Sequence, residues 1–123
     1  MRIPNLQALS VEQLVERFVI IGLAQEQAAL SDDIPEFNRL FKKMQDVVAG
    51  LRSREGDQRS ALLALYDHPN LQVRLKAVKN SLALAPEEGR RILEAIADSQ
   101  RHPQAGEAGM SIDNLDAGIF KPT

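Results

Sequence analysis

The sequence predicts an all-α protein of about six helices in one domain. Apolar residues recur every three or four positions along most of the chain, which is the spacing of one helical face. The composition is 44% hydrophobic but only 4% aromatic, with no Trp, so aliphatic side chains and Ala must fill the interior, as in helical bundles. The length of 123 residues suits a single domain with one core.

The first expected helix begins at Ser10, with Gln13 three residues later. This spacing predicts a capping box, in which each side chain satisfies a free backbone N–H of the first turn. One apolar face then comprises Val11, Leu14, Val15, Phe18, Ile21 and Ala28. Apolar residues on other sides are Val19, Ile20, Leu23 and Ala24. We therefore expect this helix to pack against more than one neighbour.

A second helix is expected to start near residue 34. Asp33 is a suitable N-cap, Pro35 is tolerated in a first turn, and Glu36 suits the positive end of the helix dipole. The expected buried stripe is Ile34, Phe37, Leu40, Phe41, Met44, Val47, Val48 and Leu51, and the expected polar side carries Arg39, Lys42, Lys43 and Asp46. Residues 10–54 should form an antiparallel helical hairpin, preceded by an extension over residues 1–9.

Two further helices are expected over residues 57–85. Gly56 and Asp57 end one helix and cap the next, which carries Ala61, Leu62, Leu65 and Tyr66. That helix should stop before Pro69, because the residue before a proline avoids the helical region. Asn70 can then cap a helix whose buried stripe is Leu71, Leu75, Val78, Leu82 and Ala85 and whose polar side carries Gln72, Lys76 and Lys79.

Residues 86–118 are expected to hold the last helix pair, followed by a tail over 119–123. Pro86, with Glu87 and Glu88, predicts a helix start, and the stripe that follows is Ile92, Leu93, Ile96 and Ala97. A second His-Pro pair at 102 and 103 indicates a weak internal repeat with the period of a helix pair. Gly106, Gly109 and Ser111 lower the helix propensity of the final element, so its continuity is left open.

One segment resembles a HEAT repeat, namely ALLALYDHPNLQVRLKAVKNSLALAP. The HEAT pattern places Asp and Pro in the turn between helices, followed by Val-Arg and then Ala. The matching positions are Asp67, Pro69, Val73, Arg74 and Ala77. The resemblance implies that Arg74 is held by the turn acid Asp67. The second copy, from Ile92 to Gly118, keeps the turn proline but lacks the Val-Arg pair.

The chain as a whole resembles a family of small bacterial proteins of unknown function with a HEAT/armadillo-like fold. The similarity is carried by FNRLFKKM, YDHPNLQVRLKA and HPQAGEAGMSIDNLDAGIFKPT. It implies a right-handed α-α superhelix, made here of an N-terminal hairpin and two helix pairs. It implies no catalytic residue and no cofactor.

Composition narrows the classes of function. The absence of Cys removes disulfides, thiolate zinc sites and thiol nucleophiles. The net charge of -2, with both signs interspersed, disfavours nucleic acid as a partner. Neither a secretory signal nor an apolar run of membrane-spanning length is visible, so we expect a soluble cytoplasmic protein.

The sequence DHPN at 67–70 admits a chemical and an architectural interpretation. His68 beside Asp67 could be a general base with its orienting acid, or His68 and His102 could share a metal with Asp67 or Asp98. Neither arrangement has a recognised catalytic or ligand spacing. Asp, Pro and Asn each form turns for local backbone reasons, so we interpret the stretch as a helix stop, a corner and a new cap. Acidic residues at 32, 33 and 36 are interpreted as capping groups rather than a calcium loop.

The function predicted from these features is a non-catalytic protein-binding module, acting as a monomer or weak homodimer. Helix-pair folds commonly bind macromolecules with the exposed sides of their second helices. We therefore expect a partner protein to contact Gln72, Lys76 and Lys79, and an immunity or regulatory role follows by analogy alone. A basic ridge of Arg74, Lys76, Lys79, Arg90 and Arg91 keeps a nucleic-acid-binding alternative open. An enzyme ranks third, because no converging polar groups are visible.

Overall fold

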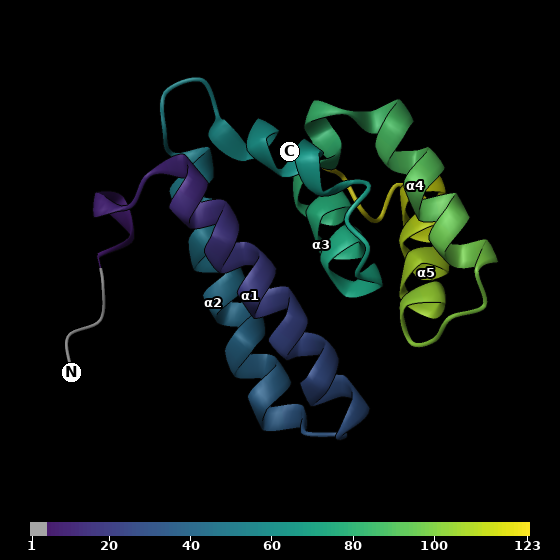
Figure 1. Ribbon diagram of the computed structural model, residues 1–123. Coiled ribbons are helices and arrows are strands. Elements are labelled where there is room, and N and C mark those ends of the chain that lie inside the picture. Colours follow the sequence, from purple (N-terminus) through teal and green to yellow (C-terminus); the bar gives the residue numbers. More distant parts are fainter. Residues whose placement is uncertain (1–4) are drawn as a thin grey trace. The chain divides into compact units, whose positions relative to one another are not determined.

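The computed structural model describes residues 5–123, and its regular elements are all helical (Figure 1). The chain divides into two compact units, Met1–Ala61 and Leu62–Thr123. The all-α prediction is confirmed for the described residues, whereas the single domain and the superhelix stay predictions. No helix within residues 5–123 combines the length and the apolar character needed to cross a bilayer.

Two long antiparallel helices form the N-terminal unit, α1 (Val11–Leu30) and α2 (Ile34–Arg52), and Figure 1 shows them side by side. The capping box at the start of α1 is confirmed. The Gln13 backbone N–H donates to Ser10 Oγ at 3.1 Å, and the Ser10 N–H donates to Gln13 Oε1 at 2.8 Å. At the start of α2, Asp33 Oδ1 accepts from the Glu36 N–H at 3.2 Å, as expected of an N-cap.

The buried core of this hairpin is narrower than the predicted stripes, because Val11, Val15, Ile21 and Phe37 are only partly buried. Its buried members include Leu14, Phe18, Leu40, Met44, Val47 and Leu51. Two positions of α2 depart further. Ile34 and Phe41, which the sequence assigned to the buried stripe, are 63% and 47% exposed. Because these two residues lie seven positions apart, they lie on the same face of α2, next to the buried stripe. The packing of the hairpin leaves this face exposed.

A short 3₁₀-helix, η1 (Leu6–Ala8), precedes α1 and is held by hydrogen bonds from Arg54, which follows the C-terminal end of α2. The Arg54 guanidinium donates to the carbonyl oxygen of Leu6 at 3.2 Å and to that of Leu9. Most of the expected N-terminal extension is thus ordered against the hairpin. Residues 1–4 lie outside the part that the structure describes.

The third expected helix is a 3₁₀-helix, η2 (Gln58–Leu65), which spans the division between the units. Asp57 still contacts its first turn as predicted, since its Oδ1 accepts from the Arg59 N–H at 3.3 Å, and its carboxylate also binds the Arg59 side chain at 2.8 and 2.7 Å. Such local side-chain bonding competes with α-helical bonding. Bonds from the N–H of Ser60, Tyr66 and His68 to carbonyls three residues earlier give the segment its tighter winding.

The fourth helix, α3 (Leu71–Ser81), is shorter than expected and is followed by η3 (Leu82–Leu84). Asn70 caps α3 as predicted, accepting from the Val73 N–H at 3.1 Å. The Ser81 hydroxyl bonds back to the Ala77 carbonyl at 2.6 Å and lies 2.7 Å from the buried Tyr66 hydroxyl. Pro86 restricts Ala85 to a non-helical conformation, so the chain breaks before α4 (Pro86–Asp98).

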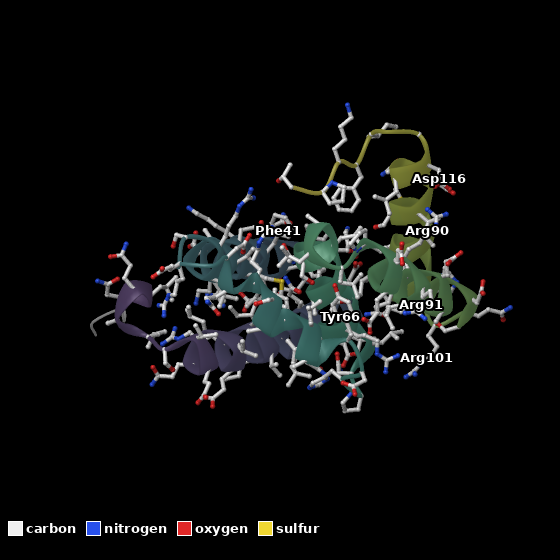
Figure 2. The ribbon with its side chains drawn as sticks, turned by 90° about the horizontal axis from the view of Figure 1, so that it is seen from above. Phe41, Tyr66, Arg90, Arg91, Arg101 and Asp116 are labelled. Carbon is white, nitrogen blue, oxygen red and sulfur yellow. The ribbon has the colours of Figure 1, made fainter. Side chains whose placement is uncertain are left out.

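The last helix, α5 (Gln104–Asp116), is continuous despite its low propensity, and it runs alongside α4 (Figure 1). Its C-terminal end is fixed to α4 by a bidentate pair, in which Arg90 donates to Asp116 at 2.7 and 3.1 Å. Figure 2 shows these two side chains lying next to each other. Gly89, in the first turn of α4, lies against the side chain of Leu82, so a Cβ at this position would force Leu82 to move.

Candidate functional site

An apolar groove runs between α1 and α2 on one side of the hairpin, with a volume of about 670 Å³. Its apolar lining includes Leu6, Leu9, Ile20, Ile21, Leu40 and Val47. Leu6 and Leu9 reach it because Arg54 holds the η1 segment at that end of the hairpin. We call this feature the hairpin groove. A concave apolar surface of this kind binds apolar side chains of a ligand or partner.

Four charged side chains also line the hairpin groove, two of each sign. Glu16 and Arg17 come from α1, and Lys43 and Asp46 come from α2. The ion pairs found among residues 5–123 use none of these four side chains. The groove therefore presents balanced charges that remain available to a partner.

Alongside the groove, α1 exposes a row of side chains at alternating intervals of three and four residues. We call it the outer stripe: Gln13, Glu16, Ile20, Leu23, Gln27 and Leu30. Three of its members are large aliphatic residues, with exposed fractions of 65% for Ile20, 41% for Leu23 and 68% for Leu30. Contiguous exposed apolar surface is typical of interaction sites. The extra apolar positions of this helix were the signal in the sequence for such a surface.

The contact surface expected at Gln72, Lys76 and Lys79 is wrong for the first two residues. Gln72 is 2% exposed and Lys76 is 6% exposed, because α5 packs over this side of α3. Gln104 Nε2 donates to Gln72 Oε1 at 3.0 Å. Lys76 Nζ and Lys79 Nζ both donate to Glu107 Oε2, at 2.6 and 3.1 Å. These polar side chains join two helices of the C-terminal unit instead of facing a partner.

Burial and charge act against each other at this cluster. Burial alone would raise the pKa of Glu107, but attraction and hydrogen bonds from Lys76 and Lys79 outweigh it and hold the pKa below its usual value. For Lys76, burial dominates and lowers the pKa of the ammonium despite the attraction of Glu107. The cluster thus joins a buried ammonium, that of Lys76, to a partly exposed carboxylate that stabilises its charge.

The positions that match the HEAT pattern differ in burial, and one contact differs from the expected one. Val73 and Ala77 are fully buried, whereas Asp67 and Pro69 are exposed. Arg74 donates to the carbonyl oxygen of His68, at 3.1 Å from Nε and 2.8 Å from Nη2, rather than to the Asp67 carboxylate. A main-chain carbonyl at the helix stop is therefore the acceptor that fixes Arg74.

The His68 imidazole belongs to the same turn. Its Nδ1 accepts a hydrogen bond from the Asn70 N–H at 3.0 Å, which orients the ring along the corner of the chain. Within residues 5–123, no group of three or more His, Asp or Glu side chains is arranged to hold a metal ion. The expected stop, corner and cap are confirmed by the end of η2 and by the Asn70 cap.

A second hollow, of about 620 Å³, lies over α5 and includes Lys79, His102, Glu107, Ser111 and Asn114. Its charged groups are already engaged, because Glu107 binds Lys79 and Lys76. The Ser111 hydroxyl donates to the Glu107 carbonyl at 2.9 Å. This hollow offers fewer available charges than the hairpin groove, since Lys79 and Glu107 already bind each other.

A family model described as a domain of unknown function (DUF2019) matches residues 12–116. The chain belongs to this family. Among solved structures, it is similar to the crystal structure of the protein RPA1889 from Rhodopseudomonas palustris CGA009, with a TM-score of 0.93 and 46% sequence identity. That match covers 98% of this chain and 100% of the other. The search of curated proteins found no match. The DUF2019 family has no assigned function, so the function is inferred from the candidate site.

Proposed function

We propose that this DUF2019 protein is a non-catalytic protein-binding module whose contact surface is the hairpin groove together with the outer stripe. The observation that carries the proposal is the exposure of Ile20, Leu23 and Leu30 along one side of α1. Exposed aliphatic side chains beside an apolar groove lose contact with water when a partner covers them, which favours association. This surface replaces the one expected on α3.

The chemistry of the groove favours a protein over a nucleic acid. A groove that holds nucleic acid needs a surplus of Lys and Arg to neutralise phosphates. Here Arg17 and Lys43 are balanced by Glu16 and Asp46. In the C-terminal unit, Arg90 is engaged by Asp116, which weakens the basic ridge expected on that side. An apolar floor with mixed charges at its edges suits a protein surface.

The finer features of the proposal come from analogy. Stacked helix pairs of the HEAT type bind other proteins through extended helical surfaces, and the sequence match at Val73, Arg74 and Ala77 favours that kinship. A regulatory or immunity role, in which the protein covers a bacterial partner, is the setting that we propose for such a module.

The proposal is tested by affinity capture from the native host, with the full chain tagged and the captured proteins identified by mass spectrometry. The variant Ile20→Glu places a charge in the centre of the contact surface and should reduce recovery of the partner at least tenfold. Met110→Glu is the matched control, since Met110 is 67% exposed on α5 and lies outside the groove. Equal recovery by the Ile20→Glu variant and the unmodified chain would remove this surface from the proposal.

A further inference from the structure

We propose that the partner of this surface is a second copy of the same chain, with α1 packed antiparallel against α1 of the copy. This inference rests on the proposed function, because it names the occupant of the hairpin groove and outer stripe. The two surfaces share Gln13, Glu16 and Ile20, which belong to the outer stripe and also line the groove. The centre of the proposed pair therefore lies beside the groove.

The spacing of the outer stripe is the first argument. Its intervals alternate between three and four residues, the a and d spacing of a coiled coil, over the whole of α1. Gln13, Ile20 and Gln27 take the first position, and Glu16, Leu23 and Leu30 take the second. Such a stripe presents a seam to another helix.

The distribution of residue types along the stripe is the second argument. A two-fold axis between residues 21 and 22 pairs Ile20 with Leu23 of the copy in two central apolar layers. The same axis pairs Glu16 with Gln27, whose amide can donate to the carboxylate. At the ends it pairs Gln13 with Leu30. A parallel arrangement would instead place Glu16 against its own copy, which brings two like charges together.

Charge balance in the groove is the third argument. A two-fold interface presents the same patch on both sides, so it is self-complementary only if the patch carries both signs. Glu16 and Asp46 supply two carboxylates, and Arg17 and Lys43 supply two cations. A strongly acidic or basic partner would leave one of these sets facing a like charge.

The association itself is tested by sedimentation equilibrium of the full chain over a concentration series. The mass should rise from the 13.6 kDa of one chain towards twice that value. The Ile20→Glu variant should stay at the mass of one chain, while Met110→Glu should behave like the unmodified chain. Circular dichroism of each variant verifies that the helices are intact.

The orientation is tested by disulfide cross-linking, for which the absence of Cys gives a clean background. One preparation carries Gln13→Cys and another carries Leu30→Cys, and the two are mixed and oxidised. An antiparallel pair should give the cross-link between the two variants, because their Cα atoms then come within reach of a disulfide. In a parallel pair these positions lie about 25 Å apart along the helix, and only links between identical variants form.

The outcomes separate this inference from the proposed function. A constant mass of one chain up to about 1 mM, or cross-links only between identical variants, would overturn the antiparallel pair. If the mass stays at one chain while Ile20→Glu still abolishes capture of a different protein, the protein-binding module stands and self-association does not. If capture is also unaffected, the proposed function falls as well.

Discussion

Lys76 shows how a single residue can be polar in the sequence and buried in the fold. Its ammonium lies under α5 and is bound by Glu107 at 2.6 Å. Removing a charge from water is costly, and Glu107 offsets part of this cost by supplying the opposite charge and an acceptor. Glu107 itself keeps 31% of its side chain exposed, so part of its hydration is retained.

We predict that Glu107→Gln lowers the free energy of unfolding by about 2 kcal/mol, below the roughly 3–5 kcal/mol typical of fully buried pairs, because Glu107 is partly solvated. The amide keeps the shape but leaves the buried Lys76 without its counter-charge. Urea unfolding followed by circular dichroism measures the change. Replacing both partners, Lys76→Met with Glu107→Leu, should cost less than the single change, and a larger loss in the double variant would contradict this explanation.

The Glu107→Gln substitution should also change how the free energy of unfolding depends on pH. Because the pKa of Glu107 is lowered in the folded protein, its contribution to stability is present above the ordinary value of 4.5 and is lost as the pH falls through the folded pKa. The pKa values of Glu36, Asp57 and Asp116 are lowered too, by hydrogen bonds to Arg39, Arg59 and Arg90 respectively. The free energy of unfolding, measured from pH 7 to pH 3, should therefore fall in the unmodified chain and in the Glu107→Gln variant, but less steeply in the variant.

At the scale of the elements, helix starts were predictable and helix lengths were less so. Ser10, Asp33 and Asn70 cap helices as the sequence indicated, because capping depends on residues only three positions apart. The 3₁₀ winding of η2 was not predicted, because its apolar spacing is also compatible with an α-helix. The early end of α3 falls at Ser81, whose hydroxyl binds the Ala77 carbonyl and lies against Tyr66 in the turn after η2.

The residues of the turn at 67–70 are expected to contribute unequally to the free energy of unfolding. Asn70→Ala should lower the free energy of unfolding by about 1 kcal/mol, because the Val73 N–H loses its acceptor. Asp67→Ala should change it by less than about 0.5 kcal/mol, as expected for an exposed surface substitution. Thermal and urea unfolding of the two variants measure the difference, and an equal or larger loss for Asp67→Ala would show that the turn acid has the role implied by the HEAT pattern.

At the scale of the whole molecule, the buried and exposed surfaces were harder to predict than the helices. The polar side of α3 could not be recognised as buried, because Glu107 and Gln104 reach it from a helix about thirty residues further along the chain. The surface on α1 could be anticipated in part, since Ile20 and Leu23 exceed what one helical partner can cover. Which apolar side of a helix stays exposed depends on how all the helices pack. The sequence alone therefore wrongly assigned Ile34 and Phe41 to the core.

We propose that partners bind this protein through the hairpin groove and the outer stripe of α1. Methyl NMR of the full chain, labelled at Ile, Leu and Met, tests this binding surface when spectra are recorded over a concentration series and with the captured partner added. We expect shifts at the methyl groups of Ile20, Leu23 and Leu30, with the Met110 signal unchanged. Shifts at Met110 with none along α1 would contradict this binding surface.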